Sequence, residues 1–166
     1  MTSPNTNAST TAVTSSRFLT GSQELRESPS PSVQQNIQAA DKVNQESLIE
    51  LEELRSLGPN WDSYGGEPPT AQALISGENL LQSAQMILGK YVGSRLEPEY
   101  IAPRADGGIQ IEWGHRPAKV SVSVTPQGGF AYLAVSWENG VREPREKHAV
   151  SLDDVIQEIA RVVFES

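Results

Sequence analysis

The stretch Ile109-Gln-Ile-Glu-Trp-Gly-His-Arg-Pro-Ala-Lys-Val-Ser-Val-Ser-Val124 decides the fold of this 166-residue chain. Apolar residues alternate with polar ones on both sides of a central turn, at positions 109, 111 and 113 and again at 120, 122 and 124. Because successive side chains of a strand point to opposite faces of the sheet, this period of two predicts two half-buried antiparallel strands.

The residues that follow extend the meander. Phe130–Trp137 reads as a third strand, and Asn139-Gly140 is a strong hairpin signal because a type I′ turn needs positive φ at both central residues. A fourth strand is expected over Val141–Val150, but Pro144 lacks a backbone N–H and restricts this segment to an edge or to a broken strand. The sequence therefore predicts three or four strands.

Helical periodicity flanks the sheet. An apolar stripe begins near Asp41 and ends at Gly58-Pro59, and Thr70 is placed to cap a second helix. After the strands, Ser151 reads as the N-cap of a last helix with acidic residues in its first turn. We predict an α+β fold of two N-terminal helices, an antiparallel meander of three or four strands and a C-terminal helix packed on the sheet.

Composition divides the chain into two parts. Residues 1–40 are rich in Ser and Thr, carry two basic and two acidic side chains, and are predicted to be a disordered polar tail. The entire net charge of -8 therefore belongs to residues 41–166, which are predicted to form a single α+β domain. An acidic surface argues against a protein that neutralises phosphates and favours a basic partner.

The chain lacks the residues that several kinds of catalytic and metal sites require. Cysteine is absent, which excludes disulfides and Cys-ligated zinc or iron–sulfur sites. The two histidines, His115 and His148, are not at metal-ligand spacing, and neither a phosphate-binding glycine loop nor a nucleophile elbow is present. We predict no catalytic residue, no metal and no cofactor. Since no apolar run resembles a signal peptide or a membrane span, a cytoplasmic location is expected.

Two alternatives remain open at this point. Asp62, Asp106 and Glu112 stand close to aromatic residues in the sequence, and a pocket that separated the pKa values of such carboxylates would suit a small carboxylate-dependent enzyme. A short basic cluster at Arg142, Arg145 and Lys147 would suit an accessory nucleic-acid-associated factor. Against the second alternative, two glutamates alternate with these cations, and the domain as a whole repels phosphate. Direct nucleic-acid binding is therefore not expected.

The most distinctive loop is Asn60-Trp-Asp-Ser-Tyr-Gly-Gly-Glu-Pro-Pro69. Its glycines permit positive φ and its prolines restrict the backbone, so a structured loop between two helices is predicted. Trp61 and Tyr64 are residue types that dominate the energetics of protein interfaces. Whether Trp61 is an exposed anchor or a core plug stays open.

This loop and the later segment Pro103-Arg-Ala-Asp-Gly-Gly-Ile-Gln-Ile-Glu-Trp113 resemble a family of uncharacterised small bacterial proteins. That family has an NWDGYGA-x-P loop followed by a P-x-x-DGGIxxEW strand, and the resemblance covers about residues 48–135, with Ser63 and Gly66 in place of Gly and Ala. It implies an accessory protein of mobile or toxin–antitoxin-like loci. It also marks the candidate interaction residues Trp61, Asp62, Tyr64, Gly65, Asp106, Gly107, Gly108, Glu112 and Trp113.

Together these features predict a non-enzymatic protein-binding module, an antitoxin-like or accessory protein whose partner is another, basic protein. No membrane contact is expected, and homo-oligomer formation is left open.

Overall fold

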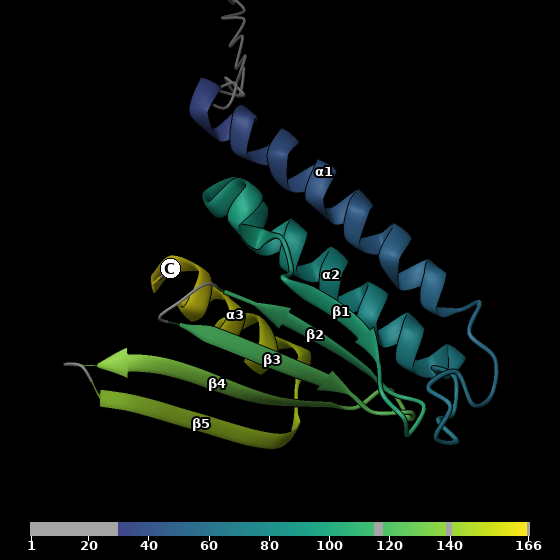
Figure 1. Ribbon diagram of the computed structural model, residues 1–166. Helices are drawn as coiled ribbons and strands as arrows, with labels where there is room; N and C mark the ends of the chain where they lie inside the picture. The colour runs from purple at the N-terminus through teal and green to yellow at the C-terminus, as the bar shows by residue number, and fades with distance from the viewer. Residues whose placement is uncertain (1–29, 115–117, 139–140, 166) are drawn as a thin grey trace, which may run out of the picture.

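The computed structural model describes residues 30–114, 118–138 and 141–165. The chain order of the elements is α1 (Pro31–Leu54), α2 (Ala71–Val92), the 3₁₀ helix η1 (Gly93–Leu96), β1 (Tyr100–Pro103), β2 (Ile109–Trp113), β3 (Lys119–Val124), β4 (Phe130–Glu138), β5 (Val141–Val150) and α3 (Leu152–Glu165). Figure 1 shows two long helices followed by a sheet and a last helix, which confirms the predicted α+β class.

The sheet is an antiparallel meander in the order β1-β2-β3-β4-β5. In its register Ile111 lies opposite Val122, and Val122 lies opposite Tyr132, so the three side chains form a row on one face. All three are buried, and both α2 and α3 contact the strands that carry them. The alternation in the sequence therefore identified the core face correctly.

The opposite face of the sheet, which we call the open face, carries exposed or half-buried side chains. Ser121 and Leu133 pair across β3 and β4 on this side, and Leu133 is 44% exposed. Trp137, further along β4, is 51% exposed. β4 is thus apolar on both faces, with one set of side chains in the core and the other facing outward.

β5 is an edge strand, as Pro144 led us to expect. The predicted turn at Asn139-Gly140 lies outside the described residues. The fifth strand, one more than the largest number predicted, is β1. Its four residues, Tyr-Ile-Ala-Pro, are too few to display a period of two, which is why the pattern alone missed it.

α1 begins at Pro31, ten residues before the predicted start near Asp41. Pro31 occupies the first turn, where its missing N–H costs nothing, and Ala40 is fully buried. The predicted boundary between residues 40 and 41 therefore falls inside a helix, and residues 31–40 belong with the folded part. The polar composition of this segment hid its apolar positions at Val33 and Ile37.

Both predicted helix caps are present. The Thr70 hydroxyl accepts a hydrogen bond from the Ala73 N–H at 3.1 Å and donates one to the Pro126 carbonyl at 2.6 Å. At α3, Ser151 Oγ accepts from the Asp154 N–H at 3.2 Å, and the Asp154 carboxylate accepts from the Ser151 N–H at 3.1 Å. This reciprocal pair is a capping box. Within the described residues, no helix is long and apolar enough to cross a bilayer.

The two faces of the sheet predict different responses to truncation. Ile111→Ala removes a fully buried side chain and is expected to lower the free energy of unfolding by about 2–5 kcal/mol. Leu133→Ala on the open face is the matched control, and we expect it to cost about 1 kcal/mol or less. Urea denaturation of both variants measures the difference, and equal losses would contradict the assignment of the core face.

Candidate functional site

The loop that begins at Asn60 and the turn before β2 lie against each other. The Glu67 N–H donates to the Ala105 carbonyl at 3.0 Å, and the Thr70 N–H donates to the Gly107 carbonyl at 2.9 Å. We call residues 60–69 and 104–108 together the loop–turn surface. It unites seven of the nine candidate residues: Trp61, Asp62, Tyr64, Gly65, Asp106, Gly107 and Gly108.

Side chains within the loop fix its backbone. The Asn60 side-chain oxygen accepts a hydrogen bond from the Gly65 N–H at 2.7 Å. Asp62 Oδ1 accepts from the Tyr64 N–H at 2.8 Å and from the Gly66 N–H at 2.9 Å, as Asx residues commonly do in turns. These two donors stabilise the carboxylate and hold the pKa of Asp62 below its usual value. The loop is therefore closed by its own polar side chains.

The two aromatic residues of the loop have different roles. The half-buried Trp61 donates from its indole N–H to the Glu67 carbonyl at 3.0 Å, and a Cβ on Gly66 would lie only 2.9 Å from that nitrogen. Trp61 thus closes the base of the loop and is neither an exposed anchor nor part of the central core. Tyr64, in contrast, is 95% exposed at the tip.

Asp106 is held on the neighbouring turn by Arg104. The Arg104 Nε lies 3.3 Å from Asp106 Oδ1, and its Nη2 lies 3.2 Å from Asp106 Oδ2. The Gly108 N–H adds a hydrogen bond of 3.0 Å to Oδ1. These groups, and first of all the hydrogen bonds from Arg104, hold the pKa of Asp106 below its usual value. The carboxylate is therefore an ion-paired turn residue.

The paired glycines of this turn are required by the backbone. Gly107 has φ of +83°, a conformation that side chains disfavour, and a Cβ on Gly108 would collide with the backbone carbonyl of Val124. The Asp-Gly-Gly motif thus has a structural reason at each of its three positions.

Glu112 and Trp113, the remaining two candidates, lie outside the loop–turn surface. Glu112 is on the open face and is ion-paired with Lys119, which also lies 3.3 Å from Glu99. Burial by itself would raise the pKa of Glu112, but hydrogen bonds from Lys119 and Gln110 outweigh it and lower the pKa. Glu112 is thus an ionised sheet residue.

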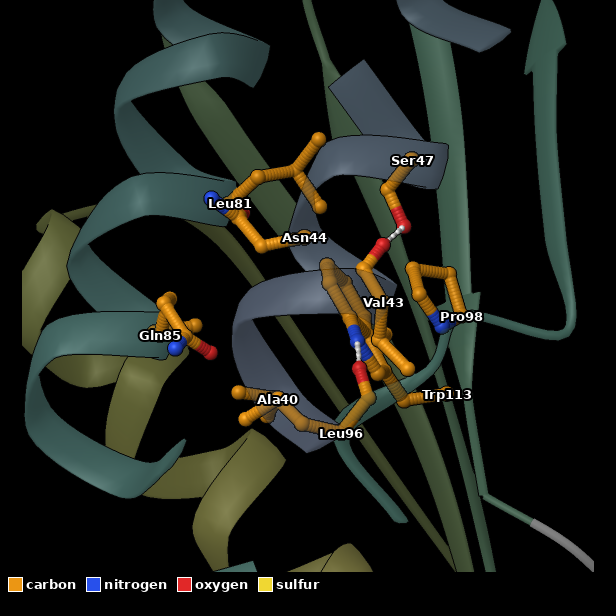
Figure 2. A pocket seen from close by; sticks show the side chains of 10 residues that line it. Ala40, Val43, Asn44, Ser47, Leu81, Gln85, Leu96, Pro98 and Trp113 are labelled. Carbon is orange, nitrogen blue, oxygen red and sulfur yellow. Dashed lines mark hydrogen bonds between the residues drawn. The ribbon is translucent and has the colours of Figure 1, made fainter. Parts of the chain in front are cut away.

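Trp113 is fully buried in the core beneath α1 and α2. Figure 2 shows its indole beside Val43 and a hydrogen bond from the indole nitrogen to the Leu96 carbonyl, which is 3.0 Å long. The cavity there has a volume of about 10 Å³, roughly what one water needs. Trp113 therefore stabilises the packing of α1 and η1 against the sheet and offers nothing to a ligand.

The basic cluster of β5 is divided between the two faces of the sheet. Arg145 lies opposite Ala134 on the core side and binds the Glu158 carboxylate of α3 at 2.7 Å, whereas Arg142 lies opposite Trp137 on the open face. His148 Nε2 lies 3.0 Å from a carboxylate oxygen of Glu146. The cluster is thus not one basic patch. His115 and Arg116 lie outside the described residues.

One charged residue was missed by the sequence analysis. Glu158 is buried on α3, with its side chain only 7% exposed. Its position, three residues after Val155 and four before Val162, placed it on the apolar stripe and could have revealed it. Among the described residues, no group of three or more His, Asp or Glu side chains is arranged to hold a metal ion.

Comparison with known proteins returned no match: no family model, no curated protein and no solved structure corresponds to this chain.

Because Gly108 lies so close to the Val124 carbonyl, we predict that adding a single methyl group at Gly108 destabilises the protein. Gly108→Ala is expected to lower the free energy of unfolding by about 1–3 kcal/mol, because the Val124 carbonyl cannot move without disturbing the sheet. Gly58→Ala is the matched control, since a Cβ there has nothing within 4 Å. Thermal unfolding of both variants tests this, and a neutral Gly108→Ala would contradict the described turn.

The lowered pKa of Asp62 predicts a response to acid. Because the pKa is lower in the folded than in the unfolded chain, the stability that the charged carboxylate contributes is present above its ordinary value of 3.8 and is lost as the pH falls through the lowered pKa. Asp62→Asn keeps an acceptor oxygen but removes this titration, so its stability should fall less steeply in acid. Urea denaturation from neutral to acidic pH measures the slope, with Asp153→Asn, an exposed residue of α3, as control.

Proposed function

We propose that this chain is a non-enzymatic protein-binding module, an antitoxin-like or accessory protein of the cytoplasm, and that the loop–turn surface contacts a basic protein partner. The observation that carries the proposal is the 95% exposure of Tyr64 on a loop closed by backbone hydrogen bonds to the side chains of Asn60 and Asp62.

An exposed aromatic ring on a fixed backbone suits binding for an energetic reason. Tyrosine brings a large contact area with only two side-chain torsions to order, and aromatic residues are enriched among those that dominate interface energies. Since the loop is already closed by Asn60, Asp62 and the Trp61 indole, little backbone entropy is lost when a partner binds. Tyr64 is thus a pre-organised anchor.

The charge around this ring indicates the chemistry of the partner. The loop–turn surface holds the carboxylates of Asp62, Glu67 and Asp106 and one cation, Arg104, which is bound to Asp106. A lysine or arginine of the partner could stack on the Tyr64 ring and pair with Asp62 or Glu67 at the same time. The net charge of -8 on the whole chain would steer a basic protein toward this surface.

The carboxylate-enzyme alternative gains no support from the three acids that suggested it. The pKa values of Asp62, Asp106 and Glu112 are all lowered, whereas a carboxylic acid that donates a proton near neutral pH needs a raised one. The nucleic-acid alternative was suggested by the basic cluster of β5, but that cluster is divided between the two faces of the sheet, and Arg145 is bound to Glu158. We therefore propose neither of them.

Tyr64→Ala should weaken partner binding without changing the fold. Affinity capture from native lysate with the full chain as bait is expected to retain a basic protein, and the purified pair is then measured by calorimetry. We expect Tyr64→Ala to raise the Kd by about thirtyfold, the effect of losing about 2 kcal/mol at an interface anchor. Tyr100→Ala, on the open face and 53% exposed, is the matched control and should leave the Kd unchanged.

The charge variant Asp62→Asn with Glu67→Gln keeps the shape of the loop and tests the identity of the partner. It should slow association and reduce the salt dependence of binding, because rim charges act mainly on the rate of encounter. Capture of an acidic partner only, or equal binding by wild type and Tyr64→Ala, would overturn the proposal.

A further inference from the structure

A polar groove lies between β5 and α3, on a part of the molecule that shares no residue with the loop–turn surface. Its volume is about 140 Å³, whereas one water needs about 10–15 Å³ of such space, so a small ligand group fits inside. Side chains of α3 line one wall, and the core-side residues of β5 line the other. The charged residues among them are Arg145, Lys147, Asp154, Glu158 and Arg161.

The inner part of the groove is a fixed pair of opposite charges. Arg145 donates from Nε at 3.1 Å and from Nη2 at 2.7 Å to one oxygen of Glu158, and from Nη1 at 2.8 Å to the Ser136 hydroxyl. Glu158 is only 7% exposed, and Arg145 is 26% exposed. This pair neutralises itself and holds the Arg145 guanidinium in one orientation.

Two further cations stand nearer to solvent. Arg161 is 51% exposed, and its Nη1 lies 3.8 Å from the nearest oxygen of Glu158, beyond hydrogen-bond distance. Lys147 is exposed on β5, opposite Tyr132. The Asp154 carboxylate, the second anion of the groove, is engaged by the Ser151 hydroxyl at 2.6 Å. Three cations against two carboxylates make the groove positive by one charge, in a chain that carries -8.

Tyr132 adds a polar group to the lining. The residue is 4% exposed and lies opposite Lys147 across β4 and β5.

We propose that this groove binds an oxyanion, a phosphate or carboxylate group of a small molecule, between Lys147 and Arg161. The guanidinium fork and the lysine ammonium are the cationic donors that proteins use for such groups. A concave site with protein walls concentrates a positive potential that an exposed lysine on a helix cannot produce. The Arg145–Glu158 pair keeps the inner wall rigid.

The test is a titration of the ¹⁵N-labelled full chain with inorganic phosphate at constant ionic strength, followed by amide chemical shifts. We expect saturable shifts at residues 145–147 and 157–161. Lys147→Gln with Arg161→Gln should weaken phosphate binding by about a hundredfold or more, because both cationic hydrogen-bond donors to the anion are removed. Lys42→Gln with Arg55→Gln removes the same charge from exposed positions in and just after α1, and should leave binding unchanged.

Two further titrations distinguish the sources of the oxyanion. Phosphoserine presents a phosphate monoester, and acetate presents a carboxylate alone. Saturable shifts of the same amides by phosphate and phosphoserine assign the site to phosphate, and shifts by acetate assign it to carboxylates. Shifts that do not saturate with any of the three ions, or a loss as large in the α1 control variant, would overturn the proposal. The spectrum of each variant without ligand shows that it is folded.

Discussion

Burial of one sheet face beneath two helices is the constraint on which the rest of the structure depends. The row formed by Ile111, Val122 and Tyr132 is covered because α2 and α3 both contact the strands that carry it. Burial of apolar side chains stabilises at roughly 25 cal/mol per Å², so a shift of register by one residue, which would turn this row outward, is strongly disfavoured. The positions of the described turns before β2 and between β3 and β4 follow from that register.

The loop–turn surface is one consequence of this packing. Thr70 starts α2, and it is bound to the sheet twice: its N–H donates to Gly107, and its hydroxyl donates to Pro126. Because α2 packs on the sheet, Thr70 therefore places residues 60–69 against the Asp106–Gly108 turn. The loop and the turn, which are far apart in the sequence, are neighbours for this reason.

The sequence predicted those features whose cause is local. The alternation around Ile111 and the caps at Thr70 and Ser151 depend on residues close in the chain, and all were confirmed. β1 and the first turns of α1 were missed because each is stabilised by contacts with distant segments, not by its own pattern. The nine candidate residues were predicted to form one site. In the structure Trp113 lies on the core face of β2 and Glu112 lies on the open face. Only the turn before β2 contacts the loop.

The net charge of the chain does not describe the local charge of its surfaces. Although the chain as a whole is acidic, the groove between β5 and α3 contains more cations than anions. The loop–turn surface, in contrast, has a single cation, Arg104, which is ion-paired with Asp106. Both arrangements depend on where a carboxylate is engaged. Asp62 accepts two backbone N–H groups and stays accessible beside Tyr64, whereas Glu158 is buried and engaged by Arg145. A carboxylate that orders its own loop keeps that surface negative, and one that is engaged by an arginine leaves neighbouring cations such as Lys147 and Arg161 exposed.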